Sequence, residues 1–144
     1  MIASTSFSVS ALSPPTHANA PRGVVRGGVK AILRLEGLAL LAATLAAYGR
    51  LGAPWPLLAV LFLAPDLAMA FYLGGPRLGA AAYNLLHATV APLALGAAGF
   101  VLGAPLAQDL ALIWLAHIGF DRALGYGLKY STGFGDSHLG RLGS

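Results

Sequence analysis

The sequence predicts an all-α fold: an antiparallel, up-down bundle of four transmembrane helices, preceded by a disordered N-terminal tail. Hydrophobic residues make up 57% of the 144 residues and charged residues only 10%, against about 25% charged residues in an ordinary soluble domain. A soluble domain of this length could not bury so much apolar surface. The apolar residues also lie in four stretches, each near the roughly 17 to 25 residues that cross a hydrocarbon core. We therefore expect the lipid bilayer to surround most of the chain.

Residues 1–30 form the first predicted region, the disordered tail. It is rich in Ser, Thr, Ala and Pro, and the Pro14-Pro15 pair discourages a continuous helix. A signal peptide is not expected, because a basic segment and a long apolar run are both missing from this region. An alternative is that translation begins nearer Val24 or Val29.

Residues 31–144 form the predicted membrane domain, which ends in a cytoplasmic C-terminal segment. Short turns that contain Gly separate its apolar stretches, and links this short make neighbouring helices antiparallel. Small residues repeat at four-residue spacing, which predicts close packing between helices. They are Ala39, Ala43 and Ala47 in the first span, and Gly99 and Gly103 in the third. The four spans cover approximately residues 32–48, 54–73, 78–102 and 105–124.

Basic residues lie almost entirely on one side of this topology. If the N-terminus is cytoplasmic, Arg50 is the only one of the nine Lys and Arg residues on the opposite side. The positive-inside rule then predicts a multi-pass protein of a bacterial inner membrane with both termini in the cytoplasm. The net charge of +4 fits anionic lipid head groups, and nucleic-acid binding is not expected because no basic face is rich in aromatic residues. The absence of cysteine excludes disulfides, thiolate metal sites and cysteine nucleophiles.

Ionisable residues inside the spans are the most informative feature for function. An ionised side chain near a span centre costs about 2.5 to 3.5 kcal/mol, so several such groups must face inward and pair. At 1.5 Å per residue, Asp66, His87 and His117 lie roughly 10 to 14 Å from the cytoplasmic end of their spans. His117 and Asp121 are four residues apart and share one helix face. We therefore expect the polar groups of the four helices at similar levels in one half of the membrane.

Three interpretations of this cluster remain open. The first is a purely structural polar core, as in an accessory subunit. The second is a divalent metal site for Zn²⁺, Mn²⁺ or Fe²⁺ that activates a water for hydrolysis. The third is a proton or cation relay in a small transporter or channel, which would work as a homo-oligomer because four short helices barely enclose a pathway. The candidate ligands or general bases are Glu36, Asp66, His87, His117 and Asp121, with Asn84, Arg122 and His138 in support.

Two further features adjoin the cluster. Pro65 removes a backbone hydrogen bond next to Asp66, and the freed carbonyl is a possible additional ligand. The segment after the last span is rich in Gly and aromatic residues, which suits tight turns and a membrane interface. Its Asp136 and His138 either fold back under the cluster as a lid or belong to a solvated tail.

Three stretches carry a resemblance to a known family: LRLEGL at 33–38, FLAPDLAMAFYLGGPRLGAAAYNLLHATVAPL at 62–93, and IWLAHIGFDRALGYGLKY at 113–130 with DSHLG at 136–140. Over about residues 32–142 the chain resembles a bacterial family of small integral membrane proteins, the domain-of-unknown-function family numbered 4260. This family commonly has Thr before the final His-Leu-Gly, where this chain has Ser137 and keeps the hydroxyl. The resemblance implies membership and membrane topology but no chemistry.

Overall fold

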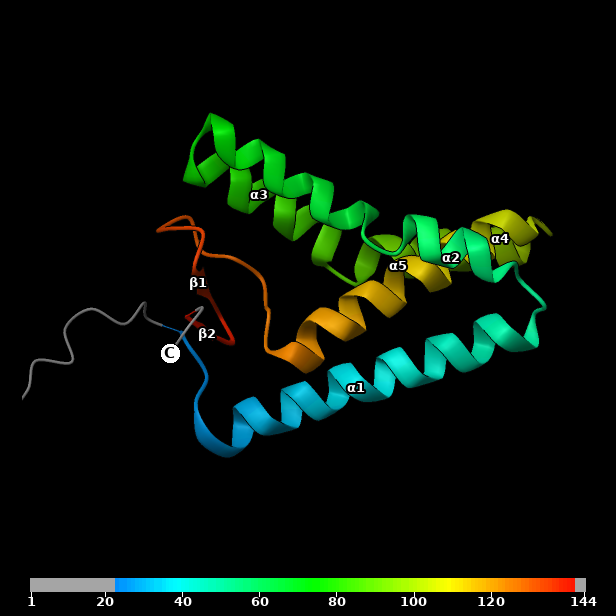
Figure 1. Cartoon of the computed structure of the whole chain (residues 1–144), viewed down its shortest axis with the longest axis horizontal. Coiled ribbons are helices and arrows are strands. Elements are labelled where there is room, and N and C mark those ends of the chain that lie inside the picture. Colours follow the sequence, from blue (N-terminus) through cyan, green and yellow to red (C-terminus); the bar gives the residue numbers. More distant parts are fainter. Residues whose placement is uncertain (1–22, 142–144) are drawn as a thin grey trace, which may run out of the picture.

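The computed structural model describes residues 23–141, which are mainly helical and end in an irregular segment and a small C-terminal hairpin (Figure 1). The all-helical class predicted from the sequence is thereby confirmed, whereas residues 1–22 of the predicted tail lie outside the described residues. Strands β1 (Asp136–Ser137) and β2 (Gly140–Arg141) pair antiparallel. The helices are α1 (Gly27–Arg50), α2 (Trp55–Leu61), the 3₁₀ helix η1 (Ala64–Gly74), α3 (Pro76–His87), α4 (Val90–Val101) and α5 (Pro105–Leu124).

Three helical segments within residues 23–141 are long and apolar enough to cross a membrane: Gly27–Arg50, Trp55–Gly74 and Pro76–Val101. Many of their large apolar side chains have no protein cover, and Val60, Leu67 and Phe100 are each more than 70% exposed. Apolar exposure on this scale is rare on soluble monomers and is consistent with a lipid environment.

Helix α5, the fourth predicted span, is the innermost helix of the structure. It packs against α1 and α4, and Figure 1 shows it running between α1 and the α3 region. Eight of its residues are buried. It carries three charged residues, Asp109, Asp121 and Arg122, and is not one of the three segments that are apolar enough to cross a membrane. Because α5 is enclosed by protein, its polar side chains can lie away from lipid.

The second and third predicted spans are each divided into two helices, a correction to the continuous spans expected from the sequence. Helix α2 ends at Leu61, four residues before Pro65, and α3 is capped by Ala88, four residues before Pro92. A proline has no N–H to bond the carbonyl four residues earlier, and its ring clashes with that carbonyl. Both interruptions therefore follow from the prolines, and the backbone of Ala88 is extended (φ −80°, ψ 133°).

Glycine on each helix allows α1 and α5 to cross closely. A β-carbon at Gly37 would lie 2.6 Å from the β-carbon of Arg122, and one at Gly119 would lie 2.7 Å from the backbone nitrogen of Leu41. No side chain fits at such distances, so the two backbones approach one another here as small-residue helix pairs do in membranes.

The alanine repeat of the first span does not form the packing face predicted for it. Ala39 and Ala43 are exposed, and the buried residues of α1 are Gly37, Thr44 and Tyr48. Packing follows the Gly37 face because glycine permits a closer backbone contact than alanine. The prediction holds for Gly99 in α4, where an added β-carbon would lie 2.9 Å from Ala107 of α5.

The C-terminal segment turns back toward α3 after α5. Gly125 has left-handed backbone (φ 96°), and the N–H groups of Gly125 and Tyr126 donate to the carbonyls of Arg122 and Asp121 at 3.0 and 2.8 Å. This Schellman motif ends the helix and reverses the chain. The segment then forms a bridge between Lys129 and the hairpin strand β1.

Candidate metal centre

Four side chains from three elements meet inside the helical bundle. Asp66 comes from η1, His87 from the end of α3, and His117 and Asp121 from α5. Each offers one ligand atom, and these four atoms all lie within 4.8 Å of one another. The two histidines and Asp121 are buried, whereas the Asp66 side chain is 27% exposed. The group is therefore nearly enclosed, with Asp66 on its more open side.

The spacing of these atoms is that of ligands around one ion. The Nε2 atoms of His87 and His117 are 3.1 Å apart. Asp66 Oδ1 lies 3.4 and 3.5 Å from these two nitrogens, and Asp121 Oδ2 lies 3.5 and 3.9 Å from them. Tetrahedral ligands at zinc-like bond lengths of 2.0 to 2.1 Å are separated by about 3.3 Å. The donor set could therefore hold a metal ion with only small adjustments.

Helix ends and helix periodicity bring the four side chains together. Asp66 is the first acidic residue after the interruption at Pro65, and its N–H donates to Leu63 O in a 3₁₀ turn at 3.1 Å. His87 is the last residue of α3, immediately before the second interruption. His117 and Asp121 are four residues apart on one face of α5.

Tyr83 orients two of the four side chains. Its carbonyl accepts a hydrogen bond from Nδ1 of His87 at 2.9 Å, so that the proton resides on Nδ1 and the lone pair of Nε2 faces the cluster. Its hydroxyl donates to Asp121 Oδ2 at 2.9 Å, and its ring stacks on the imidazole of His87 with centroids 3.6 Å apart. Sequence reasoning missed Tyr83, although its position four residues before His87 places it on the same helix face.

The remaining predicted ligand, Glu36, is not in this group. It is exposed on α1, next to Gly37, which faces α5. Consecutive helical residues are rotated by about 100° from one another, so the neighbour of a buried glycine points elsewhere. The prediction used only the position of Glu36 along its span, which does not define its direction around the helix.

The three supporting residues lie around the cluster. Asn84 holds the C-terminal segment, because its amide donates to Lys129 O at 2.9 Å and accepts from Lys129 N at 2.6 Å. Arg122 is half-buried and packs its β-carbon against Gly37. The side chain of His138 lies against Gly127, and its Nδ1 has no hydrogen-bond partner among residues 23–141. Burial lowers the pKa of His138, and the positive charge of Arg122 lowers it further.

The C-terminal segment does fold back over the cluster, but different residues from those predicted line the space it closes. A cavity of about 270 Å³ separates this segment from the helices. Asp136 and His138, the residues expected to form a lid, are not among those lining it. The cavity is lined by Asp66, Met69, Tyr83, Asp121, Tyr126, Lys129 and Phe134.

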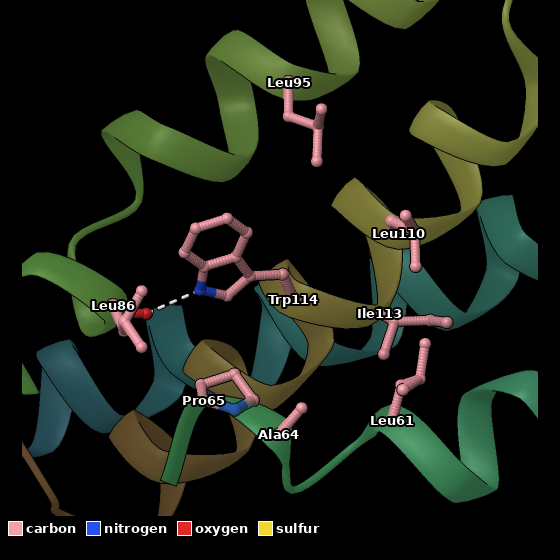
Figure 2. Close-up of a pocket in the computed structure, with 8 residues that line it drawn as sticks. All are labelled: Leu61, Ala64, Pro65, Leu86, Leu95, Leu110, Ile113 and Trp114. Atoms are coloured by element: carbon pink, nitrogen blue, oxygen red, sulfur yellow. Dashed lines mark hydrogen bonds between the residues drawn. The ribbon is translucent and has the colours of Figure 1, made fainter. Parts of the chain in front are cut away.

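A second, apolar cavity of about 310 Å³ lies against both helix interruptions (Figure 2). Pro65 and Leu86 in its wall are the chain neighbours of Asp66 and His87, and Trp114 lies one turn before His117. The indole N–H of Trp114 donates to Leu86 O at 2.5 Å. This bond satisfies a carbonyl near the broken end of α3, where regular helical bonding stops.

Fold and cluster together define a class: a small all-helical protein, apolar enough to cross a membrane, built around a buried Asp/His group that could hold a metal ion. The chain belongs to the family described as domain of unknown function (DUF4260), whose model matches residues 30–142. This match confirms the family resemblance noted in the sequence. No curated protein and no solved structure matches the chain.

Proposed function

We propose that this protein is an integral membrane metalloprotein that binds one divalent cation through Asp66, His87, His117 and Asp121. The observation that carries the proposal is the separation of 3.1 to 3.9 Å between the imidazole nitrogens and between them and the carboxylate oxygens. Two imidazoles and two carboxylates are ligands that Zn²⁺, Mn²⁺ and Fe²⁺ all accept. Zn²⁺ is favoured, because these five separations are close to the roughly 3.3 Å between tetrahedral zinc ligands.

Charge balance favours a bound cation over a purely structural polar core. Within residues 23–141, no Lys or Arg lies within ion-pair distance of Asp66 or Asp121, whose only such partners are the two histidines. The Nδ1 proton of His87 is used on a backbone carbonyl, so a neutral His87 has no proton to offer the carboxylates. Carboxylates buried without a cation are costly. A divalent ion would neutralise both.

The bound ion would serve hydrolysis, with Asp66 on the reacting side. His87, His117 and Asp121 are buried and form a two-histidine, one-carboxylate set of the kind that holds catalytic zinc. Asp66 is the partly exposed member and lines the 270 Å³ cavity. A metal ion lowers the pKa of a water in its open position to about 7. Such a water would take the place of Asp66 on the ion, and the displaced Asp66 carboxylate would accept its proton on the cavity side.

The proposed topology has four spans with both termini in the cytoplasm of a bacterial inner membrane, supported by the distribution of basic residues. The chain has no cysteine, so single-cysteine variants report sidedness without background labelling. In intact cells, a membrane-impermeant maleimide should label Leu51→Cys, between α1 and α2, and should label Ser131→Cys only after permeabilisation. The reverse pattern would invert the topology, and labelling of both in intact cells would contradict four complete spans.

Elemental analysis of detergent-purified protein tests the metal proposal. Wild type should carry near-stoichiometric metal, and His87→Ala and His117→Ala should each lose most of it. The metalloprotein proposal is disproved if folded wild-type protein contains no metal even after incubation with Zn²⁺, Mn²⁺ and Fe²⁺. The proton relay, which uses the same residues, would then be tested by transport in reconstituted vesicles.

A further inference from the structure

Lys129 brings a buried positive charge to the edge of the metal centre. Lys129 is only 6% exposed, and it lines the 270 Å³ cavity together with Asp66 and Asp121. The ammonium lies 5.2 Å from the ring centroid of Tyr83 and 4.7 Å from that of Phe134. Two of the four candidate metal ligands and a lysine therefore line the same cavity.

The ammonium of Lys129 makes no direct ion pair with a carboxylate among residues 23–141. It donates to Phe134 O at 3.0 Å. An ammonium has three donors, and a buried cation without an anionic partner is costly. Asp66 and Asp121 line the same cavity and attract the ammonium, but a metal ion bound to them would neutralise both and leave the charge of Lys129 for an anionic ligand to balance.

The backbone holds Lys129 firmly at this position. Asn84 bonds both its N–H and its carbonyl, and the residue also bridges to Ser137 of β1. The carbonyl of Phe134 fixes the end of the side chain. The ammonium is therefore preorganised, so a ligand would not have to order a long flexible side chain on binding.

We infer that the cavity binds a phosphate-type oxyanion between the Lys129 ammonium and the metal ion, so that the substrate of the proposed hydrolase is a phosphate ester. The inference rests on the proposed function. Two carboxylates and a divalent ion sum to zero, and with neutral histidines Lys129 leaves a net charge of +1 for an anion to balance. The oxyanion source is either a soluble phosphate or the head group of a phospholipid, since the cavity belongs to a protein surrounded by lipid.

The test measures by calorimetry the binding of inorganic phosphate to metal-loaded protein in nanodiscs of lipid that carries no net charge. Metal content is measured on every sample. Lys129→Gln removes the charge but keeps an N–H donor for Phe134 O, and Lys129→Arg restores a cation. Lys30→Gln is the matched control, because it removes a lysine that does not line the cavity. In a parallel arm, vesicles containing phosphatidic acid replace inorganic phosphate and are compared with phosphatidylcholine vesicles.

If the oxyanion is a soluble phosphate, wild type and Lys30→Gln should bind inorganic phosphate. If it is a lipid head group, both should prefer vesicles with phosphatidic acid to vesicles of phosphatidylcholine. Affinity should fall at least tenfold in Lys129→Gln and partly recover in Lys129→Arg, with metal content unchanged. Equal affinity in Lys129→Gln and wild type, or no binding of either probe to metal-loaded wild type, would overturn the inference and leave the metal site standing. Wild type without metal would overturn the proposed function and, with it, this inference.

Discussion

The Nε2 atoms of His87 and His117 lie 3.1 Å apart, although the residues are 30 positions apart in the chain. Each comes from a different helix, α3 and α5, and each is buried. Two neutral imidazoles placed edge to edge gain at most one hydrogen bond between these nitrogens. The same distance suits two lone pairs directed at one ion, as the proposed centre requires, and the two aspartates complete that set.

Tyr83→Phe should weaken metal binding without abolishing it. The substitution removes the hydroxyl that donates to Asp121 Oδ2 but keeps the ring on His87 and the carbonyl that orients it. Loss of such an outer-shell partner typically lowers metal affinity about 10- to 100-fold. Competition with a chelator of known affinity measures the change.

Tyr72→Phe is the matched control for that experiment. The hydroxyl of Tyr72 is buried without a hydrogen-bond partner among residues 23–141, so its removal should leave metal affinity unchanged. Equal affinities in wild type and both variants would show that Tyr83 does not support a metal ligand.

Glu36→Gln and Asp66→Asn form a matched pair of carboxylate removals. Glu36 is exposed and lies outside the group, so its variant should keep the full metal content. Asp66 contributes one of the four ligand atoms, and its variant should lose metal or bind it at least tenfold more weakly. Metal loss in Glu36→Gln with retention in Asp66→Asn would favour a site of different composition.

Gly37→Ala should destabilise the α1–α5 crossing. The new methyl group would lie 2.6 Å from the β-carbon of Arg122 and 2.7 Å from the backbone nitrogen of Ala123, and overpacking of this kind costs about 1 to 3 kcal/mol. Thermal unfolding in detergent should show a lower Tm. Gly28→Ala is the control, because no atom lies within 4 Å of the added methyl group, and its Tm should not fall.

His138 should make stability depend on pH. Burial and then Arg122 lower its pKa in the folded chain, so the unfolded chain binds the proton first as the pH falls below about 6.5. The contribution of neutral His138 to stability is therefore complete above that pH and is lost as the pH falls further. The Tm difference between pH 7.5 and pH 5.5 should be smaller in His138→Gln than in wild type. An unchanged difference would show that His138 is not a source of the pH dependence.

The sequence predicted the composition of the candidate centre better than its geometry. Apolar run lengths and a rise of 1.5 Å per residue placed the ionisable groups at one level, and four of the five proposed ligands do meet. Glu36 was wrongly included among the ligands, because the position of a residue along a helix does not define its direction around the helix axis unless the packing face is known. The alanine repeat indicated the wrong face, since the closest contact of α1 is made through Gly37.

Two other features depended on contacts that local patterns do not encode. Pro65 was noted as a source of disruption, but the break caused by Pro92 lies inside a long apolar run and was missed. The segment after the last span was expected at a membrane interface, and Lys129 within it was not singled out. Its place beside the cluster depends on the chain reversal at Gly125 and on the bonds to Asn84. Such long-range pairings appear only once the helices are assembled.

X-ray absorption at the metal edge of the zinc-loaded protein tests the four-residue metal centre most directly. The account predicts four nitrogen and oxygen ligands near 2.0 to 2.1 Å, with the multiple-scattering signature of two imidazoles. His117→Ala should reduce that signature to one imidazole or release the ion, and Glu36→Gln should leave the spectrum unchanged. A spectrum without imidazole, or one identical in wild type and His117→Ala, would contradict the proposed site.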